Sequence, residues 1–279
     1  MKSRSVLACI GTLLAIVPIS ASAFTTSFTS YTPGTEIAGS NGWSINNAGA
    51  DSSTFFSLSY GAWMPYKGNA GDLRRAAELG GWQDSPLADP NPVILSQSQE
   101  VAGELKNVSF SVDFSVRTNT GDFAGTPRDA FGFSLLGAAS ANLVTILLNP
   151  EDGGSGDAYR IGYTVGSGAF VPAEDANHDP LYAHASSYYT MALNFLTGGT
   201  DPTFSVLITS LGSGQGTMTF GGTATGLGSA TMDTFAAVWN VNGGGDNGMT
   251  FDEITVVPEP STALLAGLAS LGLLRRRRH

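Results

Sequence analysis

Asp175, Asn177 and Asp179 place three side-chain oxygens at alternate positions of one short segment. This spacing is typical of a loop that holds a calcium ion, because every second side chain can turn toward the same cation. Pro180 stands where an EF-hand loop needs glycine for its sharp turn, so a solvated acidic turn is the alternative interpretation. The sequence therefore gives Ca²⁺ as a cofactor candidate, with no cofactor at all as the alternative.

Familiar catalytic constellations are missing from the sequence. Glycoside hydrolysis needs two carboxyl groups on either side of a sugar, whereas Asp252 and Glu253 are adjacent and would point to opposite faces of a strand. No serine lies in a Gly-x-Ser-x-Gly setting, and His178 and His184 are the only histidines before the C-terminal one. We therefore predict that the protein is not an enzyme, and a glycan-active hydrolase is the alternative.

Aromatic side chains in the first third of the chain are candidates for a sugar-binding surface. They are Trp43, Trp63, Tyr66 and Trp82. Aromatic faces stack on sugar rings, and neighbouring Asn, Asp and Gln side chains supply hydrogen bonds. Packing in the core is the alternative for each of them, and it is the prediction for Trp239, which lies in an apolar run.

The N-terminus has the three parts of a secretory signal peptide. Lys2 and Arg4 give it a charged start, residues 6–19 are apolar, and Ala21-Ser22-Ala23 is a small-residue cleavage site before Phe24. The Sec machinery and signal peptidase are therefore predicted partners.

The C-terminus combines a proline-flanked glutamate, an apolar segment and a basic end. Pro258-Glu259-Pro260 precedes an uncharged stretch, which is followed by Arg275, Arg276, Arg277 and Arg278. As a helix, residues 261–274 would span about 21 Å, less than the roughly 30 Å of a hydrocarbon core. Arginines extend the reach of such a helix by snorkelling, and they stay on the cytoplasmic side. The sequence therefore predicts transient insertion of this helix in the inner membrane, with the preceding chain outside.

These three features in this order resemble a PEP-CTERM sorting domain, over residues 257–279. The resemblance implies recognition by exosortase, a membrane transpeptidase of Gram-negative bacteria that make exopolysaccharide. It also implies that the tail is removed and that the body reaches the cell surface or extracellular matrix. A plain membrane anchor is the alternative.

The charge between the two terminal signals is strongly negative. The whole chain has a formal net charge of −10 at pH 7. Residues 24–257 keep seven of the 13 basic residues and 22 of the 23 acidic ones, which gives −15. Such a body repels nucleic acid and anionic membranes, so no nucleic-acid partner is expected. Cys9 is the one cysteine, so the body must be stabilised by a hydrophobic core and not by disulfides.

The apolar pattern of the body predicts β-strands almost throughout. Val108, Phe110, Val112, Phe114 and Val116 alternate with polar residues, as in a half-buried strand. Further β-branched and aromatic runs occur at 54–60, 131–136, 143–148, 159–165, 188–196, 204–209, 235–241 and 250–257. Residues 72–79 are predicted to form one short helix.

The expected fold is all-β: an antiparallel two-sheet sandwich of the jelly-roll type, because two such sheets bury each other's apolar faces. One domain, residues 24–256, lies between the signal peptide, 1–23, and the sorting signal, 257–279. Segments 24–45 and 251–256 resemble the edges of concanavalin A-like jelly rolls. The predicted function is a structural or adhesive component of the surface or extracellular matrix, and a lectin-like carbohydrate-binding module is the alternative.

Overall fold

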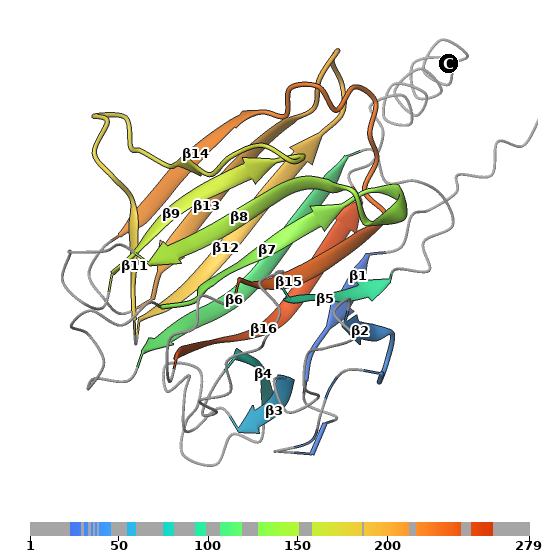
Figure 1. The fold of residues 1–279 in the computed structure, drawn as a ribbon, viewed down its shortest axis with the longest axis vertical. Helices are drawn as coiled ribbons and strands as arrows, with labels where there is room; N and C mark the ends of the chain where they lie inside the picture. The colour runs from blue at the N-terminus through green and yellow to red at the C-terminus, as the bar shows by residue number, and fades with distance from the viewer. Residues whose placement is uncertain are drawn as a thin grey trace, which may run out of the picture.

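A computed structural model describes residues 23–28, 31–32, 35, 37, 39–45, 55–59, 75–80, 93–98, 107–118, 128–150, 158–185, 187–211, 216–240 and 247–258. Two antiparallel sheets, stacked face to face, make up almost all of this part of the chain (Figure 1). This arrangement confirms the predicted two-sheet sandwich.

Sheet A follows the order β14-β13-β12-β6-β16-β4-β3, with β1 paired to β16 beside β4. Its strands are β1 (Phe24–Thr26), β3 (Phe55–Ser59), β4 (Arg75–Gly80), β6 (Val108–Thr118), β12 (Tyr188–Leu196), β13 (Thr203–Ser210), β14 (Thr217–Thr223) and β16 (Asn247–Pro258). Strand β16, the last one that the structure describes, thus lies inside the sheet, between β6 on one side and β1 and β4 on the other.

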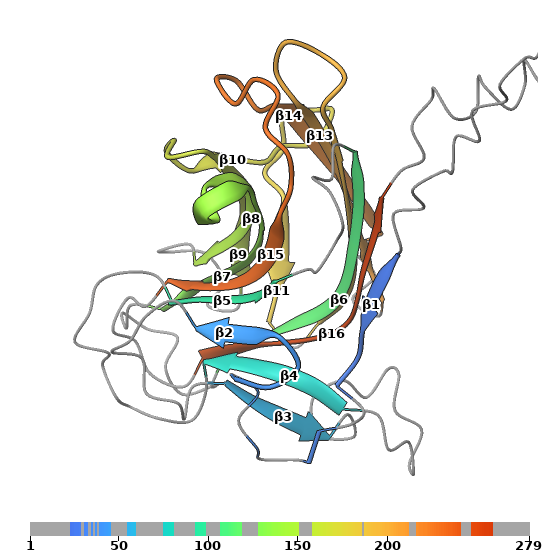
Figure 2. The same ribbon diagram turned by 90° about the vertical axis from the view of Figure 1, so that its right-hand side faces the viewer.

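Sheet B follows the order β10-β9-β8-β7-β15-β5-β2, with β11 paired to β9. Its strands are β2 (Trp43–Ile45), β5 (Val93–Ser98), β7 (Ala130–Leu136), β8 (Asn142–Pro150), β9 (Ala158–Val165), β10 (Val171–Pro172), β11 (Tyr182–His184) and β15 (Thr234–Asn240). A short 3₁₀ turn, η2 (Ala138–Ser140), joins β7 to β8. Figure 2 shows the two sheets edge-on, curved over each other.

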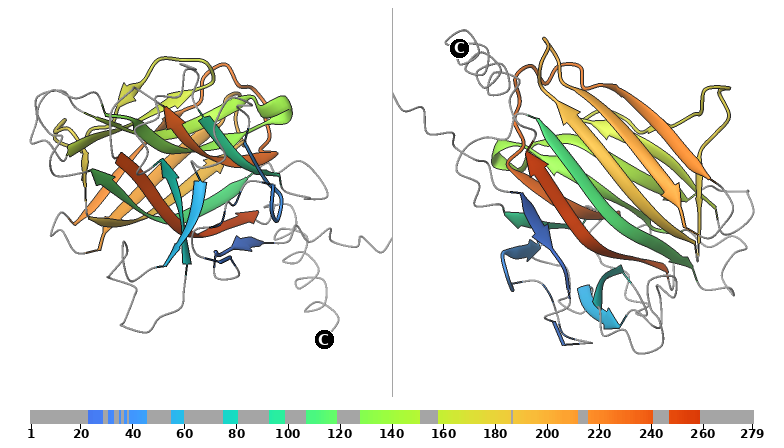
Figure 3. Two further views of the ribbon diagram at one scale, coloured as in Figure 1. Left: turned by 60° about the horizontal axis from the view of Figure 1, so that its bottom comes forward. Right: turned by 180° about the vertical axis from the view of Figure 1, so that it is seen from behind.

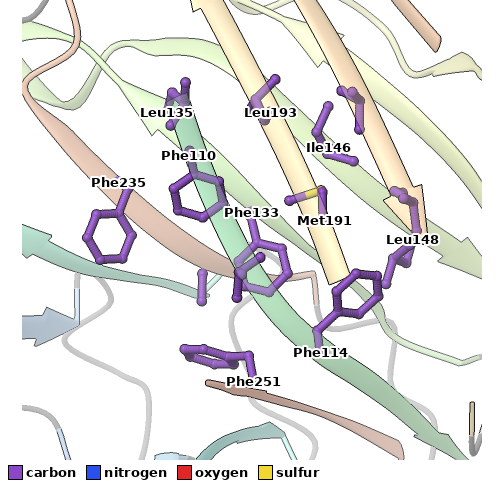
Figure 4. Packing of buried hydrophobic residues seen from close by; sticks show 14 of the residues in the cluster. Phe110, Phe114, Phe133, Leu135, Ile146, Leu148, Met191, Leu193, Phe235 and Phe251 are labelled. Carbon is purple, nitrogen blue, oxygen red and sulfur yellow. The ribbon is translucent and has the colours of Figure 1, made fainter. Parts of the chain in front are cut away.

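The core fills the space between the sheets because each strand turns alternate apolar side chains inward. All five apolar residues predicted for the inner face of β6 are at most 1% exposed, which confirms the alternation. The rings of Phe114 and Phe251 pack edge-on to Phe133 of sheet B, with centroid distances of 5.8 and 5.6 Å. Figure 4 shows these rings among Leu, Ile and Met side chains from both sheets.

Strand β16 contains a bulge that keeps its two halves in phase with the core. The register with β6 shifts between Asp252 and Thr255, and Glu253 has a φ of 50°. The additional residue restores the inward direction of Ile254 and Val256, which are fully buried like Phe251 before the bulge.

The predicted helix at 72–79 is wrong. Residues Arg75–Gly80 form β4, which pairs with both β3 and β16. The segment Arg-Arg-Ala-Ala-Glu-Leu favours helix by intrinsic propensity, but pairing within a sheet overrides such a weak local preference.

Candidate functional site

The predicted signal cleavage site adjoins the first strand. Phe24 begins β1 and is the register partner of Val256 near the end of β16. Next to this pair, the hydroxyl oxygens of Thr25 and Thr255 are 3.4 Å apart. Ala23 is exposed at the start of the described residues, and Ala21 lies outside them. The predicted mature N-terminus is therefore fixed beside the C-terminal strand.

The Pro-Glu-Pro segment begins inside sheet A. Pro258 is the last residue of β16 and is the register partner of Val108. Val256 is fully buried, whereas Val257 is 39% exposed. Glu259, Pro260 and Arg275, Arg276, Arg277 and Arg278 lie outside the described residues, as does the predicted apolar helix. Within the part of the chain that is described, no helix is long and apolar enough to cross a membrane.

The candidate calcium ligands come together in an exposed turn between β10 and β11. One carboxylate oxygen of Asp175 accepts the backbone N–H groups of Asn177 and Asp179 at 2.8 and 2.9 Å. The other accepts the Asn177 side-chain amide at 3.3 Å. These hydrogen bonds, that of Asp179 first, lower the pKa of Asp175. The described residues contain no group of three or more His, Cys, Asp or Glu side chains placed to hold a metal ion.

Trp43 lies in the core, not on a surface. It is 2% exposed and packs edge-on to Phe235 at 5.6 Å and tilted against Phe28 at 5.7 Å. This placement corrects the prediction that Trp43 belongs to an exposed sugar-binding surface. The ring instead packs β2 against the hydrophobic core between the two sheets. Trp63, Tyr66 and Trp82 lie outside the described residues.

Trp239 occupies the core, as predicted from its apolar run, and is 7% exposed. Its indole N–H donates to a carboxylate oxygen of buried Asp129 at 2.8 Å, and its ring stacks on Phe131. The hydrogen bond satisfies the polar end of the indole, so this pair is a structural feature of sheet B.

Two buried carboxyl groups on neighbouring strands were missed by sequence reasoning. Asp252 of β16 and Asp113 of β6 are register partners, with exposed fractions of 0% and 8%. Asp252 accepts the backbone N–H of Phe28 at 3.4 Å, and Asp113 accepts the hydroxyl of Thr190 at 2.6 Å. Burial raises the pKa of Asp252 to about 7. Asp113 alternates with apolar residues as in a half-buried strand, and nothing in the sequence pattern signals that this end of the polar face is covered.

The rest of that face is open. We call it the outer face of sheet A: alternate residues of 190–196, 203–209 and 217–223, together with Ser109, Ser111, Thr255 and Val257. These positions hold Ser, Thr, Asn, Ala, Gly, Leu or Val, and none is charged. Figure 3, right, shows the face from behind, with no described segment crossing these strands.

Solved structures with the same fold come from proteins of distant sequence. The CBM2 module of the evolved Dit protein of Lactobacillus casei BL23 phage J-1 is 14% identical, with a TM-score of 0.50, over 85% of this chain and 96% of that one. The catalytic domain of the glycoside hydrolase family 131 protein from Coprinopsis cinerea is 13% identical, with a TM-score of 0.52, over 84% and 93%. Both likenesses support the jelly-roll-like fold of the body.

Sequence comparison with curated proteins gives no match. A family model does match the C-terminal residues: the PEP-CTERM protein-sorting motif, over residues 256–278. The matched segment begins at Val256, inside β16, and includes the Pro-Glu-Pro segment and the four arginines. The chain carries a PEP-CTERM protein-sorting motif at residues 256–278.

Proposed function

We propose that this chain is a secreted surface or extracellular-matrix protein of a Gram-negative bacterium, with a structural or adhesive role, which is processed by exosortase. The observation that carries the proposal is the sorting motif at residues 256–278, which begins inside β16 of the sandwich. The motif implies exosortase as the processing partner. After processing, exopolysaccharide is a proposed partner of the β-sandwich body.

The pairing of the two ends supports this proposal. Because β1 and β16 are antiparallel and Phe24 lies opposite Val256, the segments before Phe24 and after Pro258 leave the sandwich at the same end of this strand pair. A signal peptide and a sorting tail would then attach the precursor to the inner membrane at one corner. The Sec machinery, signal peptidase and exosortase would all act there.

Intact-mass measurement of the native protein, with its location in the cell, tests the proposal. We expect the native form to lack residues 1–23 and the arginine cluster. A Glu259→Ala, Pro260→Ala variant should stay in the membrane fraction with its tail, because both changes lie beyond β16 and leave the sandwich intact. Ser261→Ala is the matched control and should be processed normally. A native protein that keeps its tail would make the segment a plain membrane anchor.

Carbohydrate binding is the second candidate function. Its support is the shared fold with one protein named as a CBM2 module and another named as a glycoside hydrolase. Trp63, Tyr66 and Trp82 remain the proposed contact residues, and no catalytic residue is proposed. Retention on a panel of polysaccharides tests this candidate: Trp63→Ala or Trp82→Ala should abolish retention, whereas Val171→Ala on sheet B should not. A wild-type protein that no polysaccharide retains would exclude it.

A further inference from the structure

We propose that the outer face of sheet A binds a second copy of this chain. This inference goes beyond sorting and does not depend on it, because it concerns how delivered bodies contact one another. Among the described residues, four large apolar side chains are exposed: Val171, Leu196, Leu207 and Val257. All but Val171 lie on the outer face, with exposed fractions of 38% to 42%. Three apolar side chains on one uncharged surface favour contact with protein over contact with water.

The register brings small side chains to the middle of this face. Leu207 of β13 lies between Thr219 of β14 and Ala192 of β12, and Ala192 lies opposite Ser111 of β6. Small residues let two sheets approach to the roughly 10 Å of ordinary face-to-face packing. Leu207 on one side of this row and Val257 on the other would then fill the space between the two copies.

The absence of charged side chains from the outer face of sheet A favours self-association through this face. Residues 24–257 have a formal net charge of −15, so two copies repel each other wherever carboxylates would meet. A contact through the outer face would include ionised side chains only at its margin. The hydroxyl and amide groups of the face can both donate and accept hydrogen bonds. A twofold arrangement, with the same surface on both copies, fits these properties.

The size of the face meets the requirement of a specific interface. Five strands at a spacing of about 4.8 Å, each contributing up to eight residues at about 3.4 Å, give roughly 500 to 600 Å² per copy. The pair would bury roughly 1,000 Å² or more in total, which is the lower limit for a specific contact between proteins. A reversible dimer is therefore the expected species.

Sedimentation velocity of the protein produced from the full-length chain tests the proposal. The wild-type protein should show a concentration-dependent monomer–dimer equilibrium, and the dimer should be tighter in high salt, which screens the repulsion. Leu207→Glu should raise the dimer dissociation constant at least tenfold. Thr219→Glu, at the exposed partner position of Leu207, should have the same effect. Both side chains are exposed, so the thermal midpoint of the dilute monomer should not change.

Val171→Glu is the matched control, because Val171 is 43% exposed, like Leu207 at 42%, but lies on β10 of sheet B. It should leave the dimer intact. A wild-type protein that is monomeric at every concentration would overturn the proposal, as would equal weakening by Val171→Glu. If the protein stays monomeric and Leu207→Glu instead abolishes retention on a neutral polysaccharide, the face binds glycan and not a second copy.

Discussion

Asp252 is an acid whose ionisation opposes folding. Its side chain is fully buried, and burial raises its pKa from 3.8 to about 7. Between these values the folded protein binds a proton that the unfolded chain has released. The free energy of unfolding must therefore fall as the pH rises, by up to about 1.4 kcal/mol per pH unit for this one group. Above pH 7 the full cost of burying the charge is present.

Asp252→Asn should remove this pH dependence. The amide keeps an oxygen to accept the Phe28 N–H and carries no charge, so we expect up to about 4 kcal/mol more stability at pH 8 and little change at pH 4. Denaturant unfolding of the secreted protein from pH 4 to pH 8 measures the effect. Asp175→Asn is the control: the pKa of Asp175 is lowered, so its ionisation does not change above pH 5. If the free energy of unfolding of Asp252→Asn fell with pH as steeply as that of the wild type, Asp252 would not be the group responsible.

At the level of single residues, sequence reasoning succeeded where a local pattern was sufficient. The inward positions of β6 and the burial of Trp239 follow from alternation and from an apolar run. The burial of Trp43 could not be predicted in this way, because it comes from contacts with Phe28, Phe235 and Phe251, which are remote in sequence or outside its strand. The covered position of Asp113 and Asp252 likewise depends on tertiary contacts.

At the level of elements, the bulge at Glu253 holds β16 in phase with the core. Insertion of an alanine between Glu253 and Ile254 would turn Ile254 and Val256 toward the outer side, and exposing two such side chains costs about 3 to 6 kcal/mol. Glu253→Gly keeps the residue count and suits the φ of 50°, so it should change stability by no more than about 1 kcal/mol. Thermal unfolding of both variants measures the difference. Equal midpoints for wild type and the insertion variant would show that the bulge does not set the phase.

The strands predicted from the sequence are those rich in β-branched and aromatic residues, such as β12 and β13. The strands that were not predicted have weaker patterns. The sequence of β4 favours a helix by intrinsic propensity, and β14 contains two adjacent glycines, Gly221 and Gly222. Gly221 is required by close packing, because a Cβ there would lie 2.5 Å from the carbonyl oxygen of Phe204. Such a constraint belongs to the pairing of two strands and is invisible in either strand alone.

At the level of the whole molecule, the two ends of the sandwich lie close enough to be joined. Cross-strand partners such as Phe24 and Val256 have Cα atoms about 4.5 to 5.5 Å apart. A permuted chain that joins Pro258 to Phe24 through a linker of about four residues and opens between Gly198 and Gly199 should fold. Both glycines lie in an exposed turn, so we expect a loss of about 1 kcal/mol, or about 2 to 4 °C in the thermal midpoint.

Circular dichroism and thermal unfolding of the permuted protein measure this effect. A chain opened instead between Gly132 and Phe133, in β7 between β8 and β15, should not fold, because it interrupts two ladders of hydrogen bonds. If the first permuted chain also failed to fold, the pairing of β1 with β16 would not be the contact that closes the molecule.

The strand order also sets when folding can finish. Among the described residues, β15 and β16 are the last strands, yet each lies inside its sheet: β15 between β7 and β5, and β16 between β6 and the strands β1 and β4. Neither sheet can complete its strand pairing until β15 and β16 are available. Contacts of such long sequence separation form slowly. During N-to-C export, the chain would cross the membrane with both sheets still open, and folding would finish only as the sorting motif reached the membrane.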